Sequence, residues 1–177
     1  MKHLFIDETS DANNTNYLGI CAALIDTSKY GELKHEYLTI MSEFGWDPSV
    51  EFKGTMIYSQ SQGCQSVLVE KRIELTKNII GMNKSTSNSR VKFCYASSTS
   101  GSTAESYLNL VQIVTSKALE AGTTSKNGKN IVSIHCDERT DVTAKDIRTV
   151  IDPILERKNL VLFEDVNLSK SSVQTMG

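Results

Sequence analysis

The sequence predicts an α/β fold in which helices flank a mixed β-sheet that begins with a β-hairpin. Two apolar runs, 4–6 and 17–25, are separated by a polar stretch with two adjacent asparagines, which is typical of two strands joined by a turn. Further along, short strand-like runs alternate with longer segments of helical periodicity, which favours a sheet covered by helices. The chain has 177 residues, of which 39% are hydrophobic, so we expect a single domain over 1–177 with one core.

The remaining strands are predicted where apolar or alternating residues form short runs. Val91 to Ala96 alternates in polarity, Ile131 to Cys136 is mostly apolar, and Leu160 to Phe163 forms a last short run. The prediction places 131–136 in the same sheet as 4–6. Glu164 and Asp165 follow this run, and 169–177 is predicted as a polar tail.

Four helices are predicted from apolar residues that recur every three or four positions. They cover 30–44, 66–82, 103–121 and 143–157. Thr103 is expected to cap the third helix at its amino end. In the fourth, Pro153 removes a backbone hydrogen bond, so we expect a kink there or a break at Asp152.

Composition narrows the classes of partner. The net charge of −2 gives no overall attraction to nucleic acid or to an anionic membrane. No apolar run approaches the roughly 20 residues that span a bilayer. The apolar stretch at the amino terminus, before Asp7, is too short for a signal peptide. We therefore expect a soluble, cytoplasmic protein without a membrane partner, and leave open a protein partner or a homo-oligomer. Widely spaced Cys21, Cys94 and Cys136 fall in strand-like runs and are expected as buried free thiols.

Carboxylates at the ends of strands are the candidate catalytic residues. Asp7 and Glu8 follow the first apolar run, and Asp137 follows Cys136 in the same way. Glu51 lies in a short extended piece after the first helix. If Asp7, Glu51 and Asp137 converge, they can bind Mg²⁺ or Mn²⁺, which prefer oxygen ligands. The alternative is that they are solvated turn residues.

Three neighbouring residues have weaker signals. Side chains alternate along a strand, so Glu8 should point to the face opposite Asp7, and it ranks below Asp7 as a candidate. Lys53 shares the face of Glu51 and is either a phosphate contact or an ordinary solvated lysine. His135 shares the face of Asp137 and either joins the site or is a structural histidine. Neither a phosphate-binding glycine loop nor a nucleophilic triad is recognisable.

Four short motifs, in this order, resemble domain-of-unknown-function family 3800. They are Ile6-Asp7-Glu8-Thr9-Ser10, Glu51-Phe52-Lys53, the strand that ends in Asp137, and the tail from Asn167 to Gln174. The family typically shows Ile-Asp-Glu-Ser-Gly, Glu-x-Lys, an Asp after a central strand, and a closing Gln-x-Ala-Asp. It is similar to ribonuclease H-like nucleases in fold.

The resemblance implies a ribonuclease H-like fold and a metal-dependent nuclease or phosphodiesterase that acts on nucleic acid, in a defence or mobile-element context. It implies Asp7, Glu51 and Asp137 as ligands of Mg²⁺ or Mn²⁺, with Glu8 as a further catalytic candidate. Lys53, Lys170 and Gln174 are the corresponding substrate-binding candidates.

The sequence departs from the family pattern in two places. Thr9-Ser10 replaces the Ser-Gly of the first motif. Of the closing Gln-x-Ala-Asp motif only Gln174 is matched, and no Asp follows it in the sequence to Gly177. The alternative function is therefore a catalytically inactive ribonuclease H-like binding or assembly module.

Overall fold

The computed structural model describes residues 1–10, 16–47, 49–59, 67–82, 90–120 and 130–169. They form two compact units. One contains the described residues of Met1–Thr27 and Val91–Ser171, and the other those of Ser28–Arg90. The prediction of one domain over 1–177 stays a prediction. Within the described ranges, no helix has both the length and the apolar character that a membrane crossing requires.

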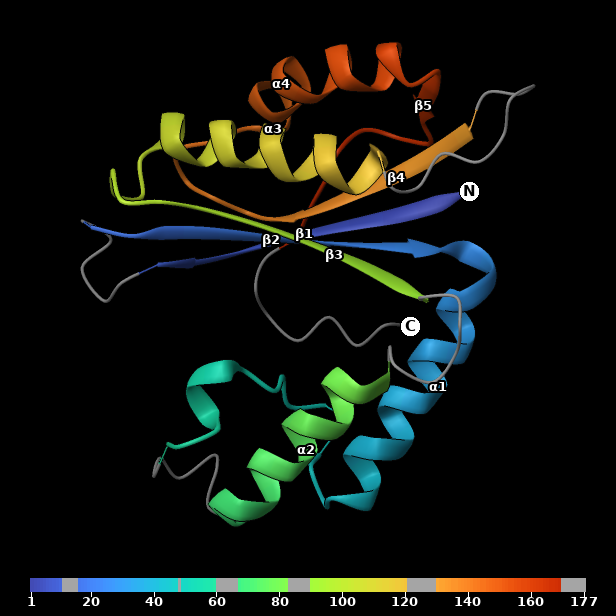
Figure 1. The fold of residues 1–177 in the computed structure, drawn as a ribbon, viewed down its shortest axis with the longest axis vertical. Coiled ribbons are helices and arrows are strands. Elements are labelled where there is room, and N and C mark those ends of the chain that lie inside the picture. Colours follow the sequence, from blue (N-terminus) through green and yellow to red (C-terminus); the bar gives the residue numbers. More distant parts are fainter. Residues whose placement is uncertain (11–15, 48, 60–66, 83–89, 121–129, 170–177) are drawn as a thin grey trace. The chain divides into compact units, whose positions relative to one another are not determined.

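The first unit is built on a mixed sheet (Figure 1). Three strands are antiparallel neighbours, in the order β3, β2, β1, and β1 is followed by β4 and β5 in parallel. A further short strand, β6, also pairs in parallel with β4. The strands are β1 (Lys2–Ser10), β2 (Leu18–Asp26), β3 (Val91–Ser98), β4 (Asn130–Asp137), β5 (Leu160–Leu162) and β6 (Asn167–Ser169).

This arrangement confirms the predicted fold class at the level of an α/β fold with a mixed sheet, an N-terminal β-hairpin and flanking helices. The hairpin is formed by β1 and β2, which pair from Lys2↔Asp26 to Ser10↔Leu18. Strand β4 lies directly beside β1, so residues 131–136 do share a sheet with residues 4–6.

Two helices, α3 (Ala104–Glu120) and α4 (Ala144–Arg157), cover one face of the sheet (Figure 1). Their amino ends are fixed by side chains: Ser106 N–H donates to Thr103 Oγ1 at 3.1 Å, and Thr143 forms a capping box with Asp146. The main core lies between these helices and the sheet. Its fully buried large side chains include Leu4, Leu18, Ile20, Val111, Val114, Leu119, Ile134, Ile147, Ile151 and Ile154.

Helix α4 runs through Pro153, so the break considered at Asp152 does not occur. A proline inside a helix costs about 3 kcal/mol. Ile147, Ile151 and Ile154 lie on the inner side of this helix and are at most 1% exposed. Burying each contributes about 1.5–3 kcal/mol, so their packing outweighs the proline and keeps the helix continuous.

The second unit contains α1 (Thr27–Glu43) from Ser28 onward, α2 (Val69–Gly81) and a short 3-10 turn at Gly54–Met56. It has a small core of its own around Met41, Trp46, Val67 and Leu75. The Trp46 ring packs edge-on against Phe52 with ring centroids 4.8 Å apart. Arg72 donates hydrogen bonds to the carbonyls of Met56 and Ser59, which fastens the segment after the 3-10 turn to α2.

The cysteines only partly follow the prediction of buried thiols. Cys136 is buried and Cys94 is half-buried, but Cys21 is exposed. Cys21 lies on β2 between buried Ile20 and Ala22, and successive side chains of a strand point to opposite faces. Cys21 therefore points away from the core, although it lies in an apolar run.

Candidate functional site

Asp7 and Asp137 end the part of the sheet that β1 and β4 share. The parallel pairing of these strands runs from Lys2↔Val132 to Ile6↔Cys136, and each aspartate is the next residue of its strand. Neighbouring strands lie about 4.8 Å apart, so the pairing brings the two backbones together at this level. The two carboxylates lie far apart in the sequence, yet they come from adjacent strands.

The two aspartates also share a face of the sheet. Leu4 and Ile6 on β1, and Ile134 and Cys136 on β4, are buried on the face that α3 and α4 cover. Because side chains alternate, the residue after Ile6 or Cys136 points to the opposite face. Asp7 is exposed there and Asp137 is partly exposed.

The first strand is longer than the sequence suggested. The apolar run ends at Ile6, but β1 continues to Ser10 because β2 remains paired with it as far as Leu18. Asp7 therefore still pairs with β2, but it lies one residue past the last pair between β1 and β4. Its Oδ1 accepts a hydrogen bond of 2.8 Å from the backbone N–H of Glu8.

The charges of the two aspartates affect the thiols beside them. Asp7 pairs across the hairpin with Cys21, whose pKa is raised by the loss of some water around its sulfur and, next, by the charge of Asp7. Burial raises the pKa of Cys136 to about 12, and the neighbouring Asp137 adds to this rise. Both thiols therefore stay protonated and uncharged at neutral pH, and neither is an activated nucleophile.

Strand β6 adds a residue that sequence reasoning missed. Ser169 pairs with Asp137, and its backbone carbonyl accepts a hydrogen bond of 2.9 Å from Glu138 N–H. The stretch reads as a polar tail because only Leu168 of its three residues is apolar. Its tertiary pairing with β4, rather than any local pattern, makes it a strand.

Glu8 lies on the other face, as the alternation predicts, and it is held by Arg139. Arg139 Nη1 lies 2.6 Å from Glu8 Oε2, and its guanidinium also binds both carboxylate oxygens of Asp141 at 2.9 Å. The same group donates to Ser102 and lies 4.8 Å from the ring centre of Tyr107. Hydrogen bonds to Asp141 and Glu8 raise the pKa of Arg139 despite its burial, so it stays charged. This network joins the end of β1 to the loops before α3 and α4.

Arg139→Met should destabilise the protein by about 2 kcal/mol, less than the roughly 3–5 kcal/mol of a fully buried pair, because Glu8 keeps some solvent contact. Adding Glu8→Gln should recover part of this loss, since no carboxylate is then left without its partner. Urea unfolding measures both. As a control, Arg148→Met removes exposed pairs with Asp152 and Asp165 and should change stability by less than about 1 kcal/mol. Equal losses in the two arginine variants would contradict this role of Arg139.

Glu51 and Lys53 belong to the second unit. They form an ion pair with each other, Lys53 Nζ lying 3.3 Å from Glu51 Oε2, and both side chains are nearly half exposed. Their predicted approach to Asp7 and Asp137 stays a prediction. Lys170 and Gln174 lie outside the described residues.

The carboxylates of the first unit, Asp7 and Asp137, suit a divalent ion that takes only a few of its ligands from the protein. Among the described residues, no three His, Cys, Asp or Glu side chains gather into a group that could hold a metal ion. Mg²⁺, however, is usually held by one or two carboxylates and completes its shell with waters and substrate phosphates. Asp7 and Asp137 fit that pattern, whereas a closed all-protein cage would need more ligands.

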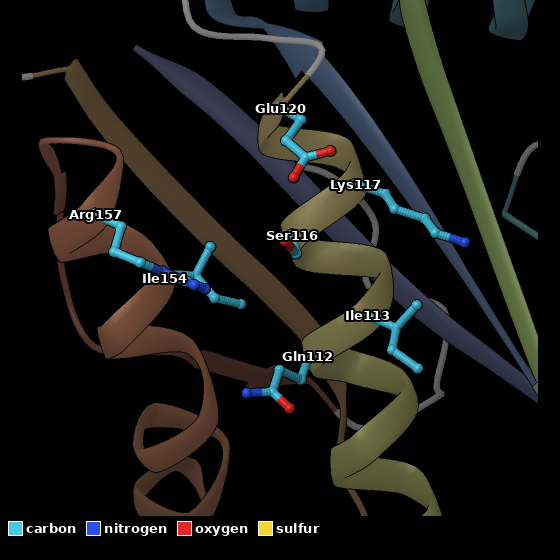
Figure 2. Close-up of a pocket in the computed structure, with 7 residues that line it drawn as sticks. All are labelled: Gln112, Ile113, Ser116, Lys117, Glu120, Ile154 and Arg157. Atoms are coloured by element: carbon cyan, nitrogen blue, oxygen red, sulfur yellow. The ribbon is translucent and has the colours of Figure 1, made fainter.

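A groove of about 400 Å³ between α3 and α4 is a different place (Figure 2). Arg157, at the end of α4, and Lys117 and Glu120, near the end of α3, line it. Helix α4 begins past the carboxyl end of β4 and returns to its amino end, where β5 pairs with Asn130. The groove therefore lies at the opposite end of the sheet from Asp137.

The chain was compared with known proteins. No family model matches it, so membership of family 3800 stays a prediction, and no curated protein matches it. Among solved structures, it is similar to the ribonuclease H2 from Pyrococcus horikoshii OT3, with 13% sequence identity and a TM-score of 0.37. The match covers 96% of this chain and 62% of that one, so this chain spans less than two thirds of its length.

Proposed function

We propose that the protein is a metal-dependent nuclease or phosphodiesterase that acts on nucleic acid. The observation that carries the proposal is the placement of Asp7 and Asp137 at the ends of adjacent parallel strands, on one face of the sheet. Like charges brought this close disfavour each other, so a bound cation is a physical reason for keeping both.

Asp7 and Asp137 would hold Mg²⁺ or Mn²⁺. When bound, such an ion lowers the pKa of a coordinated water and stabilises negative charge on a phosphate and its leaving oxygen. Glu51 is proposed as a further ligand and Lys53 as a phosphate contact. Lys170 and Gln174 are proposed substrate contacts, on the resemblance to family 3800, which also suggests a defence or mobile-element context.

Glu8 has a different part in this proposal. Its carboxylate is occupied by Arg139 on the opposite face from Asp7, so it acts on the position of the β1 end rather than on the metal. Asp7 and Asp137 would orient the ion, and the network of Glu8 and Arg139 would hold the strand ends that carry them.

Cleavage assays with single- and double-stranded DNA, RNA and a DNA–RNA hybrid test the proposal. We expect cleavage of at least one substrate with Mg²⁺ or Mn²⁺ and none with a chelator, because without a metal ion no side chain of the site would both activate water at neutral pH and stabilise the leaving oxygen. Lys53→Ala should weaken substrate binding modestly and reduce its salt dependence by about one phosphate contact. Lys29→Ala, which removes another exposed ion-paired lysine of the second unit, is the control.

The second candidate is a catalytically inactive binding or assembly module. It is favoured by the small number of carboxylates on the site face, since Glu8 is engaged with Arg139 on the other one. Nucleic-acid binding without cleavage of any substrate, with either metal, would support this candidate and overturn the nuclease proposal.

A further inference from the structure

Two histidines from different strands meet on the face of the sheet that carries Asp7 and Asp137. His3 pairs with Ser133 and Phe5 pairs with His135, so the two histidines are diagonal neighbours on β1 and β4. His3 Nδ1 lies 3.4 Å from His135 Nε2, and Ser133 Oγ lies 3.1 Å from the same Nε2. Three polar atoms that carry lone pairs thus gather in a partly buried place.

We propose that His3 and His135 form a binding site for a divalent ion that prefers nitrogen ligands, such as Zn²⁺ or Co²⁺. In a tetrahedral zinc site each imidazole nitrogen is about 2.0–2.1 Å from the metal, which separates two such nitrogens by about 3.3–3.4 Å. The observed separation of 3.4 Å has this value. An ion inserted between the rings therefore requires them to turn but hardly to move apart.

The state of the two rings also suits a metal ligand, because imidazole binds metals in its neutral form. In the free protein one ring nitrogen of the pair donates and the other accepts. On binding the ion, both nitrogens present lone pairs, and each ring keeps its proton on its other nitrogen. Binding thus requires a change of tautomer in one ring and no net loss of a proton.

Phe5 restricts the orientation of both rings. It stacks on His135 with ring centroids 4.7 Å apart and an interplanar angle of 15°, and on His3 at 6.1 Å and 22°. The stacking limits the rings to small turns, and ligands with limited freedom lose less conformational entropy when the metal binds. Ser133 Oγ lies beside His135 Nε2 and would supply a further oxygen ligand. Waters would complete the coordination.

This site is distinct from the proposed carboxylate site, and it does not depend on the proposed function. His135 precedes Asp137 by two residues, which is about 6.6 Å along a strand. Paired catalytic ions lie only about 3.5–4 Å apart, so the histidines would not supply the second ion of such a pair. The ligand types also differ, because imidazole suits Zn²⁺ and Co²⁺ while carboxylates suit Mg²⁺ and Mn²⁺.

Titration of the untagged protein with Co²⁺, followed by visible absorption, and with Zn²⁺, followed by calorimetry, tests the site. An untagged chain is needed because a histidine tag binds the same ions. We expect His3→Gln and His135→Gln each to weaken Zn²⁺ binding by at least about tenfold, as for the loss of important metal-site partners. His35→Gln is the matched control, since His35 is an exposed histidine of α1 in the other unit, and it should leave binding unchanged.

Two further measurements keep the test decisive. In the wild-type protein, imidazole nitrogen NMR should show that Zn²⁺ shifts the signals of His3 and His135 but not those of His35, which requires no variant to fold. Asp137→Asn should retain Zn²⁺ binding, so failure of the nuclease proposal would leave this result intact. Zn²⁺ binding of equal strength in His3→Gln and the wild type, or loss of binding in Asp137→Asn alone, would overturn the proposal.

Discussion

Asp7→Asn and Asp137→Asn are each expected to reduce metal-dependent cleavage of nucleic acid by at least about a hundredfold, the size of effect seen when one electrostatic stabiliser of a transition state is removed. Asparagine keeps the shape of the side chain but removes the negative charge that would hold the cation. The measurement is the rate of cleavage at saturating Mg²⁺ or Mn²⁺, with the substrate that the wild-type protein cleaves best.

The folded state should survive both substitutions. Clustered carboxylates repel each other when no metal neutralises them, so the midpoint of thermal unfolding should be unchanged or raised in metal-free buffer. Glu156→Gln removes an exposed carboxylate at the end of α4 and should leave cleavage unchanged. A variant of either aspartate that cleaves at the wild-type rate would exclude that residue from the site.

Ile134→Ala should destabilise the protein by about 3–4 kcal/mol, within the range for truncating a fully buried aliphatic side chain. Ile134 is 0% exposed on β4, where it pairs with Leu4 of the parallel strand β1, and it lies under the covering helices. Removing its outer carbons leaves a cavity that the surrounding strands cannot fill completely. Urea unfolding gives the change in the free energy of unfolding.

Ile131 provides a matched control on the same strand. It is 40% exposed, and it lies an odd number of residues from Ile134, so it points to the other face. Ile131→Ala should therefore change the free energy of unfolding by less than about 1 kcal/mol. Equal losses at the two positions would mean that β4 does not have one buried and one exposed face.

The fold was predictable where the local pattern and the packing agree. The stripe of Tyr107, Val111, Val114 and Ala118 predicts α3, and all four residues are buried against the sheet. The alternation of β1 predicts that Asp7 and Glu8 point to opposite faces, as the contact of Glu8 with Arg139 bears out. Periodicity is informative here because each of these elements buries one side only.

Tertiary contacts decided the parts that the sequence did not reveal. β6 is too short and too polar to read as a strand, and it exists through its pairing with β4. β1 extends past Ile6 because β2 is there to pair with it. Arg139 has no local signal of importance, since its role depends on Glu8, 131 residues away. The signal that could have found it is a charged residue two positions after a predicted metal ligand, Asp137.

The candidate site was predictable only in part, for the same reason. Two carboxylates that follow apolar runs can be matched to adjacent strands once a mixed sheet is assumed, and Asp7 and Asp137 are so placed. Glu51 follows no long strand, and its local structure offers only its ion pair with Lys53. Its proposed approach to the two aspartates stays a prediction, because no local sequence pattern encodes it.

Calorimetric titration with Mn²⁺ tests most directly the central claim, that Asp7 and Asp137 jointly hold one divalent ion. The wild-type protein, Asp7→Asn, Asp137→Asn and the double variant should be compared, with Glu156→Gln as the control for loss of a surface charge. If the two carboxylates share an ion, each single variant should lose most of the binding and the double variant should lose little more, because coupled residues are not additive. Mn²⁺ binding that is equal in all five proteins, or that falls by the same small step with each lost charge, Glu156 included, would contradict the claim.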